Sequence, residues 1–584
     1  MKPYSPKPRV AISLPDLLGG MAVIAIAAYF LAPSAWEPGA ESLKNWVSAN
    51  ICRQTGGFPV LHHGALYNLY LQIFLSLPYP LSVQVEHAVT HLSTYAALLL
   101  LLRRFLPRGP SLALLCAWIP ALWVVEGGAR VLGMGCLALY LAKDLDSPWS
   151  RGWTPMSLLC AALIDAFFIP FLGGHVVGTA FLRLRRGQPL WTGLPRPGPG
   201  ERAPWLAKAA LAVLVGVTVL FQSHRADHNV HGFEYPWSPI PLEEILTAAS
   251  IQVGNWKYVM RRYPESQWKD KDWYETNVEA FGGAKTLVAA VRYNPKLYLR
   301  NVFEEAQAVL KAPQGFLIGF RALAPAVRRP LIPFLLLLLA LCGYWTFRWL
   351  RGRDETAKAF ALGAGIIGAT AAYSLVYVHQ RYMMPFLPVG LLAAVHVGHS
   401  LRSLGVIARK GSLADMPYPT NPSALTLGGV YVIALLVLTA AQPHPWAQGG
   451  GFLRGNPYEL RGVLWQARGP LLKSLGRGKR VLALEEAWIR SFADVDIEKI
   501  YHPLYLPPFK DVSGDTERFL ESLDVIWVSD ALVRPIAAVG TQVYLRYNLI
   551  LEPFLRRAVQ RGWTREDVAG FGRVYQRPAD SKHG

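Results

Sequence analysis

Residues 156–182 read MSLLCAALIDAFFIPFLGGHVVGTAFL, and the number of times this stretch crosses a membrane sets the topology of the whole chain. It is almost entirely apolar and is interrupted at Ile169-Pro170, so it is either one long kinked span or two short ones. The basic clusters that flank the apolar stretches all fall on one face of the membrane only if residues 156–183 cross twice. We therefore predict two crossings here, with the N-terminus in the cytoplasm and the C-terminus outside.

The rest of the chain has the composition of a membrane protein, since 52% of its 584 residues are hydrophobic and only 17% are charged. Most of the net charge of +20 lies in short loops, as the positive-inside rule requires, so we predict no nucleic-acid partner. We predict a polytopic α-helical protein of a bacterial-type inner (plasma) membrane, with about eleven transmembrane helices. They are expected at 14–35, 84–102, 112–126, 128–143, 156–168, 170–183, 204–222, 331–349, 358–378, 383–400 and 424–442.

Two long segments on the outer face belong to the membrane core, for which we predict residues 1–442. In the outer loop 36–83, apolar residues recur at helical spacing and stop before Pro78 and Pro80, which predicts a helix lying in the membrane interface. The second outer loop, 223–315, is polar and too long to be a simple connector.

The tail from 443 to 584 has the pattern of a small extracytoplasmic α/β domain. The segments KRVLALEE, DVIWVSD and GRVYQR are typical of short strands, and the helical patterns ERFLESL and NLILEPFLRRAVQRGW lie between them. The tail has no phosphate-binding loop and no glycine-rich dinucleotide turn. We expect a lid or a module that holds an acceptor.

Ionisable side chains near a bilayer indicate function, because burying them without a partner costs several kcal/mol. In the predicted topology, several gather at the outer ends of the spans, where we expect them to line one cavity. They are Glu37, Glu41, His62, His63, Glu126, Arg130, His379, Arg381 and Tyr382. Asp165, within CAALIDAFF, is an intramembrane acid that this arrangement leaves unexplained.

The order of these features resembles the membrane-embedded C-type glycosyltransferases (GT-C), which use polyprenyl-phosphate sugars. An N-terminal span is followed by an outer loop with an early acid, an interfacial helix and a second span flanked by basic residues. A late RYMMPFLP, residues 381–388, strengthens the resemblance. It covers most of the chain as architecture but only a few dozen residues as motif, and it implies a GT-C-like fold.

The resemblance also implies roles for individual residues. Glu41, ahead of Ala49 and Gly56-Gly57, matches the family's base, with Glu37 as the alternative. The family's adjacent acidic pair is missing, which leaves open the choice between the two glutamates and any need for a divalent metal. The donor-phosphate ligands would be Arg381, Arg130, His62, His63 and Tyr382, and the supporting residues Glu126, His379 and His87, which stands where an arginine is expected.

Inverting transfer from a lipid phosphate needs one general base and positive charge around the leaving phosphate, so these residue types suffice. The predicted partners are a polyprenyl-phosphate sugar, a glycan, lipid or protein acceptor, and the lipid bilayer. No cofactor is predicted beyond the open question of a divalent metal.

Structural interpretations stand beside the functional ones. Glu126 and Arg130 are four residues apart and could form an ordinary helical ion pair. Arg381 could extend its side chain to the lipid head groups without binding a substrate. The run HRADHNVHGFE (224–234) contains metal-ligand residue types, which polar loops also collect by chance. Two other function classes remain, a transporter or flippase of a lipid-linked intermediate and a non-catalytic envelope assembly protein.

Overall fold

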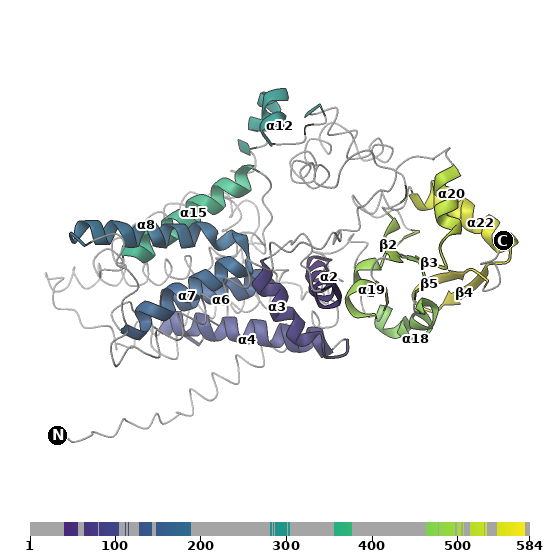
Figure 1. The fold of residues 1–584 in the computed structure, drawn as a ribbon, viewed down its shortest axis with the longest axis horizontal. Helices are drawn as coiled ribbons and strands as arrows, with labels where there is room; N and C mark the ends of the chain where they lie inside the picture. The colour runs from purple at the N-terminus through teal and green to yellow at the C-terminus, as the bar shows by residue number, and fades with distance from the viewer. Residues whose placement is uncertain are drawn as a thin grey trace, which may run out of the picture.

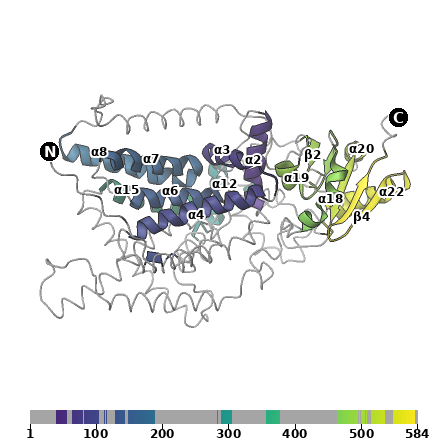
Figure 2. The same cartoon turned by 90° about the horizontal axis from the view of Figure 1, so that it is seen from below.

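The computed structural model describes about half of the chain, in segments that belong to a helical bundle and to a C-terminal sheet (Figures 1 and 2). The described residues are 40–55, 64–79, 81–103, 111–112, 115, 128–142, 148–188, 281–282, 284, 287–300, 302–303, 356–375, 463–476, 478–493, 495–496, 499–503, 506, 514–530, 532–533 and 546–578.

Five helices form the bundle, and their apolar side chains share one core. They are α4 (Leu81–Arg103), α6 (Gly128–Ala142), α7 (Pro148–Ile164), α8 (Ile169–Arg185) and α15 (Thr356–Leu375). These bounds lie close to the predicted spans, except that α7 begins eight residues before the predicted start at 156. Within the described part of the chain, α4 is the one helix both long and apolar enough to cross a membrane.

The segment 156–183 forms two helices, with the break placed slightly before the predicted one. α7 ends at Ile164, and a single 3₁₀ turn, η1 (Ala166–Phe168), leads into α8. The Asp165 carboxylate accepts a hydrogen bond from the backbone N–H of Phe167 at 2.9 Å, which caps this turn. Pro170 lies in the first turn of α8, where a missing N–H costs nothing, so the proline starts a helix and does not break one.

The bundle helices alternate in direction, while the number of membrane crossings stays a prediction. Gly128 at the start of α6 approaches Glu86 near the start of α4, and Gly135 approaches Thr94 further along, so these two helices run parallel. Figure 1 shows α8 folding back beside α7. Arg103, at the end of α4, therefore lies at the opposite end of the bundle from Glu86.

The last two bundle helices complete this alternation. Gly174 of α8 lies against Ala361 of α15, and Gly178 lies against Ala357, so α8 and α15 are antiparallel. The basic end of α8, which includes Arg183 and Arg185, thus joins Arg103 at one end of the bundle. Which end faces the cytoplasm remains a prediction.

Two shorter helices cover the end of the bundle that contains Glu86. α3 (Ala65–Phe74) confirms the helix predicted before Pro78, although its place at a membrane interface stays a prediction. α2 (Ala40–Thr55) was not predicted. Its residues 45–52 are all buried, including polar ones, because α2 packs between α3 on one side and α19 of the C-terminal region on the other.

The C-terminal region contains a five-stranded mixed sheet in the order β2-β1-β3-β5-β4. Its strands are β1 (Val481–Leu482), β2 (Ile500–Tyr501), β3 (Val525–Ser529), β4 (Thr564–Val568) and β5 (Gly572–Gln576). β1 pairs in parallel with β2 and β3, whereas β5 is antiparallel to β3 and β4. The three predicted strands coincide with β1, β3 and β5. The predicted domain boundary at 443 lies outside the described residues.

Helices cover both faces of this sheet. The side chains of β3 alternate, with Trp527 packing on the face of α18 (Val463–Leu475) and α19 (Glu486–Phe492). Ile526 packs on the opposite face, beneath α20 (Gly514–Glu521), the π-helical turn η7 (Tyr547–Leu551) and α22 (Glu552–Gln560). The helical patterns predicted around residues 517–523 and 548–563 are confirmed by these elements.

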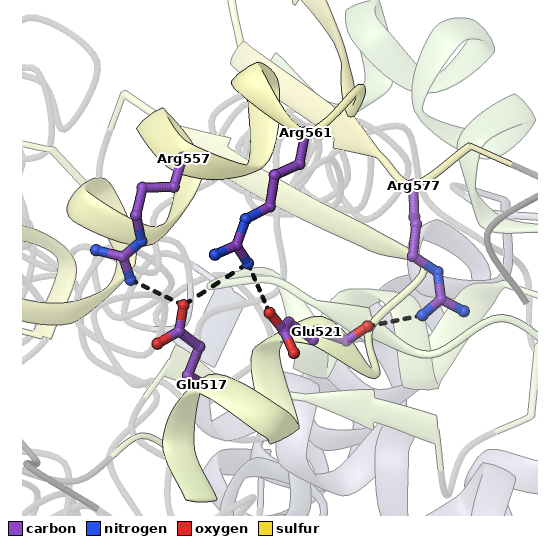
Figure 3. A network of polar contacts seen from close by, with 5 residues as sticks. All are labelled: Glu517, Glu521, Arg557, Arg561 and Arg577. Carbon is purple, nitrogen blue, oxygen red and sulfur yellow. Dashed lines mark hydrogen bonds and ion pairs between the residues drawn. The ribbon is translucent and has the colours of Figure 1, made fainter. Parts of the chain in front are cut away.

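Ion pairs on the surface join α20 to α22, as Figure 3 shows. Arg557 donates to Glu517 at 3.1 Å, and Arg561 donates to Glu521 at 2.7 Å. Arg577, after β5, donates to the backbone carbonyl of Glu521 at 2.7 Å. Because these side chains are exposed, each pair contributes less than about 1 kcal/mol to stability.

Several predicted spans lie outside the described residues: 14–35, 204–222, 331–349, 383–400 and 424–442. Only residues 111, 112 and 115 of the 112–126 region are described. In the second outer loop, α12 (Leu287–Tyr293) and residues 295–300 are helical.

Candidate functional site

A buried carboxylate lies at the end of the bundle where α3, α4 and α6 meet. Glu86, in the second turn of α4, is only 1% exposed. One of its oxygens, Oε1, accepts hydrogen bonds from the hydroxyl of Thr90 at 2.8 Å and from that of Tyr67 at 3.2 Å. Tyr70 extends the network, because its hydroxyl lies 2.8 Å from that of Thr90. A carboxylate with this many donors is held in one orientation.

The second oxygen of Glu86 faces a histidine. Oε2 lies 2.8 Å from Nδ1 of His87, whose side chain is largely buried. Which atom donates in this contact depends on the tautomer of the ring. The contact fixes the ring orientation of His87 and leaves Nε2 to meet another group.

A glycine makes this close approach possible. Gly128 is the first residue of α6, and a Cβ at this position would lie 2.3 Å from the Tyr67 hydroxyl and 2.9 Å from Oε1 of Glu86. Both distances are too short for a side chain, so α6 can begin against this polar cluster only with glycine there.

Arg130, half a turn further along α6, is also buried and pairs with an acid. Its Nε lies 3.2 Å from Oδ2 of Asp165, at the junction of α7 and η1. This contact gives a partner to Asp165, the acid in a predicted span for which the sequence suggested no role. Asp165 is the partner seen for Arg130, whereas Glu126, the helical partner considered from sequence, lies outside the described residues.

α2 joins this end of the bundle to the C-terminal sheet. Trp46 of α2 packs in one apolar cluster with Tyr67 and lies 5.5 Å from the ring of Phe492 in α19. The Asn50 side chain donates to the backbone carbonyl of Arg490 at 2.6 Å. Tyr79, just before α4, also packs on Phe492, with ring centroids 4.6 Å apart. α2 and Tyr79 are therefore held by contacts with both the bundle and the C-terminal region.

The structure brings together only part of the predicted site. His87 and Arg130 lie at the same end of the bundle, on neighbouring helices. Glu41 lies in the first turn of α2, where the backbone alone is described. The remaining predicted residues, Glu37, His62, His63, Glu126, His379, Arg381 and Tyr382, lie outside the described residues.

Sequence reasoning missed the central carboxylate of this cluster. Glu86 lies inside a predicted span, and an acid in an apolar span was the signal that could have identified it, as it identified Asp165. Its partners Tyr67 and Thr90 carry no such signal, because tyrosine and threonine are common near membrane interfaces.

The cluster offers hydrogen-bond donors, a fixed imidazole and a buried arginine, but not a metal site. Among the described residues, no group of three or more His, Cys, Asp or Glu side chains is placed to hold a metal ion. These groups are suited to binding an anion beside a hydrogen-bonded carboxylate.

Comparisons with known proteins include a likeness to a solved structure. No protein-family model matches the chain, and no curated protein matches it in sequence. A crystal structure of ArnT from Cupriavidus metallidurans in the apo state is similar over 96% of this chain and 97% of that one. The TM-score is 0.42 and the sequence identity is 12%, so the likeness concerns the overall arrangement and identifies no activity.

Proposed function

We propose that this chain is an inverting membrane glycosyltransferase of the GT-C type, which moves a sugar from a polyprenyl-phosphate donor to a glycan, lipid or protein acceptor on the outer face. The observation that carries the proposal is the segregation of charge along the bundle. Glu86, His87, Arg130 and Asp165 gather at one end of the described bundle, whereas Arg103, Arg183 and Arg185 at the helix termini lie at the other.

This segregation suits chemistry at one membrane surface. Buried ionisable groups are expensive in an apolar bundle and persist where a function or a partner retains them. Glu86, His87, Arg130 and Asp165 lie together beside the predicted first outer loop, although His175 and Lys358 are buried elsewhere in the bundle. Transporters more often place ionisable groups along a path through the midplane. A lipid-linked donor would place its phosphate at this level, because its tail occupies the bilayer.

The proposed division of labour assigns the base to the first outer loop. Glu41 takes the proton of the acceptor hydroxyl, with Glu37 as the alternative, and the step needs no second carboxylate. Arg381, His62, His63 and Tyr382 bind the donor phosphate. Arg130 joins them by sharing its guanidinium with Asp165, and Glu126 and His379 support the site.

Glu86 enters this scheme as a positioning residue. By holding Nδ1 of His87, it orients the ring and directs Nε2 toward the donor phosphate. His87 then contacts the phosphate at the position where an arginine is expected, and Tyr67 and Thr90 keep the carboxylate in place.

A transfer assay tests the proposal. The full chain is reconstituted in lipid nanodiscs with a panel of synthetic polyprenyl-phosphate monosaccharides and envelope glycan acceptors, and released polyprenyl phosphate is measured. Replacing the base, by Glu41→Gln or by Glu37→Gln, should lower turnover between about 10²- and 10⁴-fold. Glu521→Gln, on the exposed face of α20, is the matched control and should leave turnover unchanged.

Two results would overturn the proposal. One is turnover that survives both glutamine substitutions. The other is donor lipid that moves between the leaflets of proteoliposomes containing the full chain while its glycosidic bond stays intact. That result would favour the flippase.

A further inference from the structure

The strand order of the C-terminal sheet contains a switch point. From β1 the chain passes to β2 on one side and then crosses over to β3 on the other, and all three strands are parallel. In open α/β sheets, ligands bind outside the carboxyl ends of the strands where the order reverses. In this sheet that place lies between the ends of β1 and β3.

Buried polar side chains occupy this edge. Glu485 follows β1, Ser529 ends β3 and His502 follows β2, and these residues are 3%, 4% and 6% exposed. β1 ends at Leu482, and the turn that follows it brings Glu485 within interaction distance of Ser529. Three neighbouring strands thus deliver a carboxyl, a hydroxyl and an imidazole to one edge.

Two of these groups, Glu485 and Ser529, interact with each other. However, within the part of the chain that the structure describes, the two carboxylate oxygens of Glu485 and the hydroxyl of Ser529 make no hydrogen bond of normal geometry. A buried polar group in this state costs about 1–3 kcal/mol, which a binding site recovers when its ligand arrives. Glu486 differs from its neighbour, because it forms an ion pair of 2.7 Å with Arg490.

The surrounding charges indicate what kind of ligand fits. Burial raises the pKa of Glu485 to about 7, and its interaction with Ser529 lowers that pKa by a smaller amount. Burial also lowers the pKa of His502 to about 3, helped by Arg546 and Arg490, so the imidazole is neutral. The carboxyl, the hydroxyl and the neutral imidazole accept and donate hydrogen bonds, and the guanidinium groups of Arg490 and Arg546 near His502 add donors. Such a mixture of donors and acceptors is the chemistry that recognises sugar hydroxyls.

We propose that the carboxyl edge of β1 and β3 is a carbohydrate-binding site, in which Glu485 and Ser529 bind hydroxyl groups of the acceptor. The identification of the ligand as the acceptor rests on the proposed function. The existence of the site is argued from the strand order and the buried polar groups alone. α19 begins directly after Glu485 and packs on α2, whose first turn contains Glu41. An acceptor held at this edge is therefore one helix away from the loop that carries the proposed base.

Binding is measured on the full chain in nanodiscs by saturation-transfer NMR, with the methyl glycosides of glucose, galactose and mannose as probes and inorganic phosphate as the anionic comparison. Glu485→Gln and Ser529→Ala should each weaken glycoside binding about tenfold, the value of one hydrogen bond to a buried partner. Glu521→Gln is the control on an exposed carboxylate of the same domain. Amide exchange of β3 checks that each variant is folded.

Saturable binding of a glycoside that both variants weaken and the control does not would support the site. The proposal is overturned if none of the glycosides binds, if both variants bind as the wild type does, or if phosphate binds and competes. The measurement uses no donor and no turnover, so its failure is distinct from a failure of the Glu41 transfer assay.

Discussion

Replacing Glu485 by glutamine should stabilise the C-terminal sheet at high pH and have little effect at low pH. The carboxyl is buried, and its pKa in the folded chain is about 7, against 4.5 for the free side chain. A raised folded pKa means that the folded state holds the proton more tightly than the unfolded state. The contribution of Glu485 to the free energy of unfolding is therefore fully present below pH 4.5 and is lost as the pH rises through 7.

The size of the effect follows from the two pKa values. Each unit of difference corresponds to about 1.36 kcal/mol, so between pH 5 and pH 8 the wild type loses about 2.5 kcal/mol that the glutamine variant keeps. His502, with a folded pKa of about 3, acts in the opposite sense and adds stability as the pH rises toward 6.5. Because it is present in both proteins, it cancels in their difference.

Native-state amide hydrogen exchange of β3 measures this local stability without unfolding the helical bundle. Exchange is followed at pH 5 and pH 8 and corrected for the intrinsic rate. The difference between the Glu485→Gln variant and the wild type should grow with pH by the amount given above. A difference that stays constant or shrinks would refute the reasoning, and Glu521→Gln should show no pH-dependent difference.

Other substitutions test the packing of the site. Gly128→Ala should destabilise the bundle by about 1–3 kcal/mol in mixed-micelle unfolding, because its Cβ would meet the Tyr67 hydroxyl at 2.3 Å, and adding Tyr67→Phe should recover part of the loss. Asp165→Asn should lower the free energy of unfolding by about 3 kcal/mol in the same assay, because it removes the carboxylate that pairs with the buried Arg130. An unchanged midpoint would count against this ion pair. Arg561→Ala, by contrast, removes an exposed contact and should change stability by less than about 1 kcal/mol, so a larger loss would contradict the assignment of this network to the surface.

The bundle was the most predictable part of the described structure. α4, α6, α8 and α15 were predicted closely because each is a long apolar run, and a helix pairs the backbone groups of such a run within itself. The pattern of basic residues favoured two helices within 156–183, and two are present. α2 escaped prediction because it is buried by two partners, α3 and α19, that lie far apart in the sequence.

In the C-terminal region, burial again separated what could be predicted from what could not. β1, β3 and β5 contain apolar residues that face a core, whereas four of the five residues of β4 are exposed and polar, so no alternation marks it. The candidate site was predicted only in part for a similar reason. His87 and Arg130 stood out as ionisable residues near a predicted membrane boundary, but Glu86, which contacts His87, is held by side chains of two helices, α3 and α4.

The anomeric configuration of the transferred sugar tests the central claim most directly. With one carboxylate base and a phosphate leaving group, the sugar changes configuration in a single displacement, and NMR of the isolated product should show the anomer opposite to that of the donor. A product that retains the donor's configuration, or a donor recovered uncleaved from the whole panel in the presence of acceptor, would contradict the account.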